Sequence, residues 1–231
     1  MEEGVESMFD VVYDKMKEKI VLQQLIVVAR LRPDLDRKVL KAHYEKLHIQ
    51  LNKQHVWDPI TGLLLMYSSC LLHVIESSGD VLGLVLKDLE ALQQQPDSTV
   101  LEAKVVFMTH SLQRRLFQQW SSKLLDENQV SGDAVVKRLE EDEEESTQVL
   151  VCSVLSALKR LGQHLDTPQM LLPGSVLDKN PELIVPEDTL EKLLGRDELI
   201  SPQQYIKMYH SPLNISMEFG QENLGSLLSF S

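Results

Sequence analysis

The sequence lacks most of the features by which a chain reveals its compartment. Only two of its 231 residues are cysteines, Cys70 and Cys152, and they are not spaced as a pair. This content excludes a disulfide framework and a cysteine-rich zinc site, and favours a reducing cytosolic compartment. The acidic N-terminal sequence MEEGVESMFD has no apolar core, which removes a secretory signal and disfavours a mitochondrial transit peptide. No segment has the roughly 18 to 20 uninterrupted apolar residues of a membrane span, so we predict no transmembrane helix.

Basic residues are also scarce. The chain has 35 acidic against 23 basic residues and a formal net charge of -12. This balance argues against a nucleic-acid backbone or an anionic membrane as the main partner, and leaves basic or neutral protein surfaces open. The hydrophobic content of 43% is enough for a real core. The length suits one domain of about 100 to 150 residues with appended elements, or two small domains.

Motifs for catalysis or metal binding are missing as well. The sequence has neither a glycine-rich phosphate loop nor a G-x-S-x-G nucleophile elbow. His43 and His48 lie five residues apart, which on one helix rotates them off a common face, and only together with His55 would they form a metal site in a loop. We therefore predict no metal-binding residues.

Three further polar residues have a simple structural interpretation. We interpret His73, on a predicted strand, as a satisfied structural residue rather than a ligand. Cys70 is expected to be a small buried hydrophobe, since nothing near it in sequence indicates a low thiol pKa. Glu76, just ahead of a predicted helix, is expected to face solvent or to cap that helix. Linear spacing brings no two carboxylates together for acid and base work, so we predict no catalytic and no cofactor-binding residues.

The segment around which the chain is organised is ITGLLLMYSSCLLHVIESS, residues 60–78. The apolar run over 60–67 is typical of a strand buried on both faces, and its length is too short for a membrane span. Ser68 and Ser69 supply a turn, and residues 70–76 return as the paired strand. The sequence therefore predicts a β-hairpin at the centre of a sheet.

The flanking segments predict an α+β fold of the ferredoxin-like βαββαβ type. A strand over 24–31 and an amphipathic helix over 34–51 precede the hairpin, and a helix over 80–94 and a strand over 102–109 follow it. This order is the split βαβ pattern, in which an antiparallel four-stranded sheet carries both helices on one face. In the first helix we expect the apolar stripe to consist of Leu35, Val39, Ala42, Leu47 and Leu51.

Residues 4–20 predict a further helix at the N-terminus. Apolar residues recur there at steps of three and four, which places them on one stripe: Val5, Met8, Phe9, Val12, Met16 and Ile20. Two interpretations stay open. The stripe packs back on its own domain, or it docks on another chain through adaptable methionine and phenylalanine side chains.

The C-terminal half has a different texture. Residues 126–132 mark a boundary, and residues 140–145 are six consecutive acidic residues, which we interpret as a solvated loop or frayed helix end, with a docking site for a basic partner as the alternative. Residues 147–165 predict a helix whose apolar arc is wide enough to require burial. Beyond it, prolines predict an extended tail that wraps the domain and carries helices over 186–194 and 201–209 and an edge strand over 214–219.

The sequence therefore predicts four parts of the chain. They are an N-terminal amphipathic helix (1–21), a ferredoxin-like domain (22–125), an acidic loop with an apolar helix (126–165) and a proline-punctuated tail with short helices (166–231).

Short signatures in the central domain resemble a known family. ITGLLL, LLHVIES, VVFMTH and RRLFQQW are similar to the pattern of the BLUF domain, a ferredoxin-like flavin-binding photoreceptor module. The likeness covers about residues 22–125. Over a longer stretch, which includes DELISPQQYIKMYHSPLNI in the tail, the chain resembles the testis-expressed protein 47 family. The second resemblance implies a sperm or motile-cilium setting.

The flavin-binding residues of the BLUF family do not carry over. Val28 stands where the family has its flavin-contacting tyrosine, Arg30 near its serine and His73 at its glutamine, and Asn52 is spaced too far from Thr61 to match its asparagine. Only Trp120 matches, and an aromatic residue there can equally belong to the core. Each unmatched polar group buried in such a pocket costs about 1 to 3 kcal/mol. We therefore expect no bound cofactor and no photochemistry.

These observations lead to one functional hypothesis and one alternative. The hypothesis is a non-catalytic structural or adaptor subunit of a larger protein assembly, in the axoneme of the motile cilium or sperm flagellum. Its partners are other proteins, with no nucleic acid and no membrane, and its location is cytoplasmic or axonemal. Met8, Phe9, Val12 and Met16 are its expected anchor. The alternative is a flavin or small-ligand sensor with a BLUF-like pocket between the two helices and the sheet.

Overall fold

The computed structural model describes residues 21–126, 145–165 and 173–209 of the chain. The helix expected over 4–20, with Met8, Phe9, Val12 and Met16, lies outside these ranges. So do the edge strand expected over 214–219 and most of the acidic run over 140–145.

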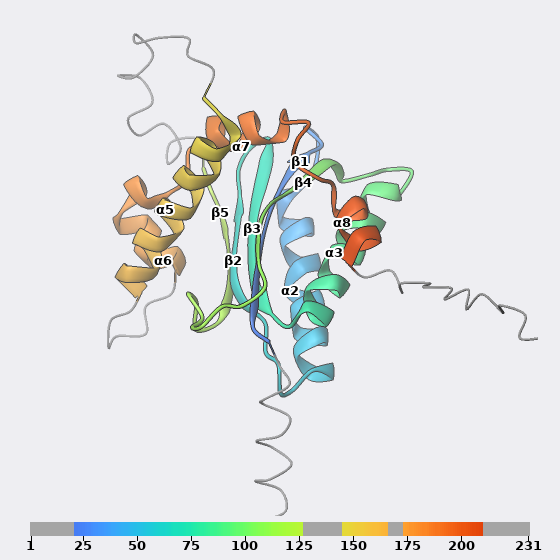
Figure 1. Cartoon of the computed structure of the whole chain (residues 1–231). Coiled ribbons are helices and arrows are strands. Elements are labelled where there is room, and N and C mark those ends of the chain that lie inside the picture. The colour runs from blue at the N-terminus through green and yellow to red at the C-terminus, as the bar shows by residue number, and fades with distance from the viewer. Residues whose placement is uncertain (1–20, 127–144, 166–172, 210–231) are drawn as a thin grey trace, which may run out of the picture.

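A five-stranded sheet forms the middle layer (Figure 1). Its strands are β1 (Gln23–Leu31), β2 (Thr61–Met66), β3 (Cys70–Ser77), β4 (Val100–Thr109) and β5 (Trp120–Leu124), in the spatial order β4-β1-β3-β2-β5. β1 lies antiparallel to β3 and β4, and β2 lies antiparallel to β3. The predicted ferredoxin-like α+β fold is therefore confirmed.

The fifth strand was not predicted. β5 pairs in parallel with β2, with Gly62 opposite Trp120 and Met66 opposite Leu124. Its five residues, WSSKL, are mostly polar and partly buried along their whole length. Such a strand has no continuous apolar run and is held by its backbone pairing with a buried neighbour, so hydrophobic patterning cannot reveal it.

The predicted hairpin is confirmed at the centre of the sheet. Every residue of β2 and β3 is buried. The turn at Ser68 and Ser69 is closed by a 2.8 Å bond from the Tyr67 amide to the Cys70 carbonyl. Gly62 in β2 has φ +147°, and a Cβ there would lie 2.0 Å from the Val74 carbonyl oxygen. Only glycine permits this close approach of two strands.

Two helices, α2 (Arg37–Gln54) and α3 (Gly79–Gln94), cover one face of the sheet as predicted (Figure 1). Asp36 caps α2 by accepting a bond from the Lys38 amide, and Ser78 caps α3 through the Val81 amide. The predicted apolar stripe of α2 was partly wrong, because Val39 is 63% exposed. The buried stripe consists of Leu40, Tyr44, His48 and Leu51. Tyr44 and His48 are not aliphatic and were left out of the predicted stripe. The predicted face is therefore rotated from the buried one by about one residue, or roughly 100°.

The opposite face carries α5 (Thr147–Leu165), α6 (Pro173–Lys179), the short η1 (Pro181–Leu183) and α7 (Glu187–Leu194). The predicted burial of α5 is confirmed: its residues Leu150, Val154, Leu158 and Leu161 join the core on this side of the sheet. α6 was not predicted, since the prolines around it indicated an extended tail.

The C-terminal tail passes from one face of the sheet to the other, as expected of a wrapping segment. After α7 the Ile200 carbonyl accepts a 2.8 Å bond from the Val105 amide of the edge strand β4. α8 (Pro202–Tyr209) then packs against α3. The predicted capping box is confirmed, because the Ser201 amide donates to the Gln204 side chain and the Gln204 amide to the Ser201 hydroxyl. The tail thus ties the two helical layers to one sheet.

Candidate functional site

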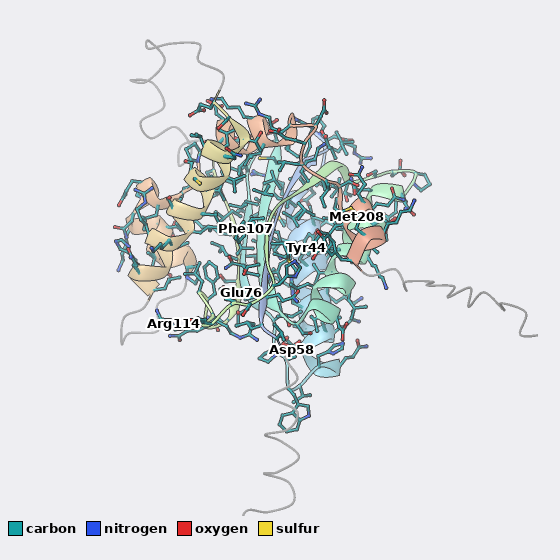
Figure 2. All side chains as sticks on the ribbon, viewed as in Figure 1. Tyr44, Asp58, Glu76, Phe107, Arg114 and Met208 are labelled. Atoms are coloured by element: carbon teal, nitrogen blue, oxygen red, sulfur yellow. The ribbon has the colours of Figure 1, made fainter. Side chains whose placement is uncertain are left out.

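A cluster of imidazole and aromatic rings lies between α2 and the sheet. We call it the histidine cluster: Tyr44 and His48 from α2, His73 from β3 and Trp120 from β5. Tyr44 and His48 are four residues apart and so project from one side of the helix. The centroid of the His73 ring lies 5.0 Å from that of Tyr44 and 5.4 Å from that of His48, and the rings of His48 and Trp120 are 4.2 Å apart. Figure 2 shows Tyr44 in the interior between α2 and the sheet.

The two histidines of the cluster are held neutral by burial. Desolvation lowers the pKa of His48 to about 3 and that of His73 well below its ordinary value. The indole Nε1–H of Trp120 donates to Nε2 of His73 over 3.1 Å, so His73 carries its proton on Nδ1. Among the described residues, neither ring nitrogen of His48 nor the hydroxyl of Tyr44 has a hydrogen-bond partner. Burial also raises the pKa of Tyr44. The cluster is thus built to stay uncharged.

The other histidines weighed as metal ligands are used elsewhere. Nε2 of His43 lies 2.8 Å from the Asp88 carboxylate and so joins α2 to α3. This hydrogen bond raises the pKa of His43. The His55 amide closes the end of α2 on the Leu51 carbonyl. Within the described ranges, no group of three or more His, Cys, Asp or Glu residues is placed to hold a metal ion.

Glu76 does not face solvent, so that prediction was wrong. Glu76 is 0% exposed. One carboxylate oxygen accepts from the Gln24 side chain at 2.9 Å and from the Leu116 amide at 2.9 Å. The other accepts from the Thr61 hydroxyl at 2.8 Å and from the Phe117 amide at 3.2 Å. A buried carboxylate is tolerated because four donors replace its water.

Arg115 completes this polar centre. Its guanidinium donates to the Thr61 hydroxyl at 3.0 Å and to the Glu76 backbone carbonyl at 2.7 Å, and it lies 3.7 Å from the Asp58 carboxylate. Burial lowers the pKa of Arg115, while Asp58 and Glu76 oppose that shift. In Figure 2, Glu76 and Asp58 lie toward the same end of the sheet. These contacts fix the segment before β5 and thereby position Trp120. Glu76 lies in LLHVIES and Arg115 in RRLFQQW, two of the segments that resemble the BLUF family. This resemblance was the sequence signal that could have drawn attention to both residues.

Val28 and Arg30, the β1 residues compared with the flavin-contacting positions, both lie on the face of the sheet that carries α5 to α7. Val28 lies in the core beneath α5 to α7, and Arg30 pairs with Glu191 of α7 on the same side. The β1 residue opposite His73 is Val27. Val27 and Ala29 face the layer of α2 and α3. Alternate residues of β1 therefore point to opposite faces of the sheet, and Val28 does not face the histidine cluster.

The prediction that Cys70 is a small buried side chain is confirmed. Cys70 is fully buried, and burial raises the pKa of its thiol.

A cavity of about 540 Å³ lies between α2 and β5. Asn52 lines it and accepts the Ile60 amide at 2.8 Å. The cavity is lined by Lys41, Glu45, His48, Ile49, Asn52, Pro59, Ile60, Thr61 and residues 118–122, none of which belongs to α3. It is therefore separate from the space between the two helices.

The fold and this site define a ferredoxin-like α+β protein of BLUF-like topology, with a neutral histidine cluster in its interior. A profile described as Testis-expressed protein 47 matches residues 21–211. The chain belongs to the testis-expressed protein 47 family, as the sequence predicted.

Solved structures of similar topology are BLUF proteins. Klebsiella pneumoniae BlrP1 with FMN and cyclic diGMP is 21% identical with a TM-score of 0.35, and the match covers 46% of this chain and 26% of that one. BlrB, a BLUF protein in its dark state, is 14% identical with a TM-score of 0.37, covering 72% and 96%. A bacterial light-regulated adenylyl cyclase is 15% identical with a TM-score of 0.37, covering 63% and 36%. This chain thus matches about a quarter of BlrP1 and about a third of the cyclase. Among the described helices, none is both long and apolar enough to cross a bilayer.

Proposed function

We propose that this chain is a non-catalytic structural or adaptor subunit of a larger protein assembly, located in the axoneme of the motile cilium or sperm flagellum. The family description, testis-expressed, supports the sperm setting. Its partners are other proteins rather than nucleic acid or membrane, in keeping with a net charge of -12.

The observation that carries the proposal is the use of the reactive side chains in the interior. The inner part of the layer between α2 and the sheet holds the chain's own rings, with Tyr44 packed edge-on against His73. Both carboxylate oxygens of Glu76 are occupied by donors of the fold. Groups that serve catalysis must reach a substrate, whereas the Glu76 carboxylate and the Tyr44 and His73 rings hold strands and loops in place.

The surface offers apolar side chains to partners. Among the residues that the structure describes, ten large hydrophobic residues on several elements are exposed: Val21, Val39, Ile49, Val56, Trp57, Leu84, Leu101, Val149, Met208 and Tyr209. Scattered exposure is ordinary, but aromatic residues and methionine at a surface are favoured in protein interfaces. The anchor expected from sequence, Met8, Phe9, Val12 and Met16, belongs to the residues that the structure does not describe.

Detergent extraction of sperm flagella tests the axonemal assignment. We expect the tagged full chain to stay with the axoneme after membranes and soluble proteins are removed, and to be released by high salt together with a defined set of partners. A chain that leaves completely with the soluble fraction would contradict the proposal. Tagged green fluorescent protein, expressed in the same cells, is the control for trapping.

The cavity beside α2 favours a second candidate, a flavin or small-ligand sensor. Its volume of about 540 Å³ falls within the range of about 300 to 1,000 Å³ that ligand pockets occupy. Absorbance of the purified full chain, before and after incubation with FMN or FAD and removal of free flavin, separates the two. The adaptor proposal expects a colourless protein that retains no flavin. A yellow protein with a flavin spectrum supports the sensor.

A further inference from the structure

Helix α2 has a second stripe, on the side that faces away from the sheet. α2 lies beside α3 on one face of the sheet (Figure 1), and its sheet-facing stripe is buried. On the outward side, exposed residues recur at steps of three and four and continue into the turn after the helix: Val39, Ala42, Lys46, Ile49, Lys53 and Val56. We call these six residues the α2 outer stripe. Because such steps place residues on one side of a helix, the stripe is a continuous surface.

The apolar part of this surface is well exposed and held in place. The large apolar members are Val39 at 63% exposure, Ile49 at 56% and Val56 at 64%. Trp57 follows at 53%. The turn that carries Val56 and Trp57 is fixed, because the Asp58 carboxylate accepts a 2.9 Å bond from the Ser78 amide. Four of the ten exposed large hydrophobic residues of the described chain therefore lie on one helix and the turn that follows it.

The same helix is basic. α2 contains five lysines and arginines against a single acidic residue, Glu45, whereas the whole chain has a net charge of -12. Glu45 is paired with Lys41 at 3.5 Å. Among the described residues, Lys46 and Lys53 form no salt bridge. Their charges are therefore available to a partner.

We infer that the α2 outer stripe binds a helix of another protein that carries apolar residues and carboxylates on one face. Steps of three and four are the spacing through which two helices pack in a coiled coil, and a lysine within such a stripe selects the partner and its register. Lys46 and Lys53 are seven residues apart, about 10 Å along the axis, so the partner's carboxylates recur at the same interval. The inference deepens the proposed function and rests on it, because it states the chemistry of one partner.

Two other occupants fit the stripe less well. An anionic bilayer attracts lysines, but Lys46 and Lys53 alternate with the apolar members, so insertion of those members would bury unpaired charges. A second copy of the stripe would bring lysine against lysine, since the stripe contains no acidic residue. The acidity of the chain as a whole does not prevent binding of an acidic helix, because charges more than about 8 Å away are largely screened at physiological ionic strength.

Fluorescence anisotropy with the purified full chain tests the inference. The probe is a labelled synthetic helix of several heptads, with leucine at a and d and glutamate at e and g, and the matched control peptide has lysine in place of glutamate. Like charges at e and g keep each peptide from pairing with itself. We expect the glutamate peptide to bind and the lysine peptide not to bind. Raising NaCl from about 0.05 M to about 0.5 M should weaken binding about tenfold.

Charge reversal locates the binding on the helix. Lys46→Glu with Lys53→Glu should weaken binding of the glutamate peptide by about tenfold or more and should create binding of the lysine peptide. The matched control, Lys87→Glu with Lys159→Glu, reverses exposed lysines of α3 and α5. It changes the net charge equally and should leave binding of the glutamate peptide unchanged. Far-UV circular dichroism confirms that the variants are folded.

A second variant keeps both lysines and removes apolar surface. Val39→Ser with Ile49→Ser should weaken the glutamate peptide several-fold, since both side chains are exposed and their loss does not disturb the core. Unchanged binding in this variant, or no binding of the glutamate peptide to the wild type, overturns the inference. So does an equal loss in the two charge-reversed variants.

Two further measurements identify the competing occupants. Sedimentation of the chain with phosphatidylserine vesicles that depends on Lys46 and Lys53 assigns the stripe to a membrane and overturns the inference. A dimer in analytical ultracentrifugation that charge reversal dissociates assigns the stripe to a second copy and overturns it too. The adaptor function fails by a different result, which is complete loss of the chain to the soluble fraction when flagella are extracted.

Discussion

The histidine cluster should make the protein acid-sensitive, and one substitution isolates the effect. His48 is 2% exposed and His73 is 3% exposed, and burial lowers the pKa of both. The unfolded chain therefore binds more protons than the folded chain once the pH falls below the ordinary histidine pKa of 6.5. The free energy of unfolding must decrease as the pH falls through that value.

The magnitude follows from linkage. Between about pH 7.5 and about pH 5.5, each histidine that stays neutral in the folded state removes about 1.4 kcal/mol of stability, and the two together remove about 2.7 kcal/mol. The pKa of about 3 for His48 lies well below this interval, so the group stays neutral throughout. His43 acts in the opposite sense. Its pKa is raised by Asp88, so its contribution grows as the pH falls toward 6.5 and is constant below.

Comparison of two variants with the wild type removes the contributions of His43 and the carboxylates, which are common to all. His48→Phe keeps a ring against Trp120 and cannot be protonated. We expect urea unfolding, followed by far-UV circular dichroism, to show a loss of stability between about pH 7.5 and about pH 5.5 that is smaller by about 1.4 kcal/mol than in the wild type. His164→Gln, at an exposed position of α5, is the control for removing a surface histidine. If His48→Phe loses as much stability as the wild type across this interval, the reasoning is refuted.

Two further predictions concern single positions in the sheet. Glu76→Gln should lower the free energy of unfolding by at least about 1.5 to 3 kcal/mol, the contribution of one charged hydrogen bond, because an amide cannot accept on both of its arms. Urea unfolding measures this against the partly exposed control Glu90→Gln, and equal stabilities would show that the four bonds to Glu76 contribute nothing. Gly62→Ala should abolish or strongly reduce soluble protein, since its Cβ would lie 2.0 Å from the Val74 carbonyl oxygen and its φ of +147° is strained for alanine by about 1 to 3 kcal/mol. At Gly174, where a Cβ meets nothing within 4 Å, alanine should leave the yield unchanged, and a normal yield for both variants would contradict the reasoning.

The central hairpin could be predicted from sequence because burial there is complete. Each residue of β2 is buried, so the run of apolar letters corresponds directly to a strand with both faces covered. α5 was equally clear, since its apolar arc had to be buried against something. β5 was missed because its side chains alternate between Trp120, which packs on His48, and polar residues such as Lys123, which pairs with Asp178 of α6. Partners that lie so far away in sequence leave no local pattern.

The polar interior shows a second limit of sequence reasoning. Glu76 has a charged side chain and stands next to a predicted helix, so local rules place it in water or at a cap. Its burial depends on donors from residues 24, 61, 116 and 117, which only the folded chain brings together. The same holds for His48, whose environment is made by His73 and Trp120 from two different strands. Composition identifies such residues as polar, and only tertiary structure determines their role.

Trp120 belongs to both the histidine cluster and the lining of the cavity between α2 and β5, and this shared residue links protonation of the cluster to occupancy of the cavity. One part of its ring packs on His48, and another lines the cavity. An occupant that covers Trp120 also keeps water from His48 and so favours the neutral imidazole. By reciprocity, protonation of the cluster must weaken the occupant by the same free energy. We therefore expect acrylamide quenching of Trp120, in the Trp57→Phe background, to increase only as the pH approaches the His48 pKa of about 3, and before the chain unfolds. Quenching that stays constant until the unfolding transition would show that the cavity and the cluster act independently.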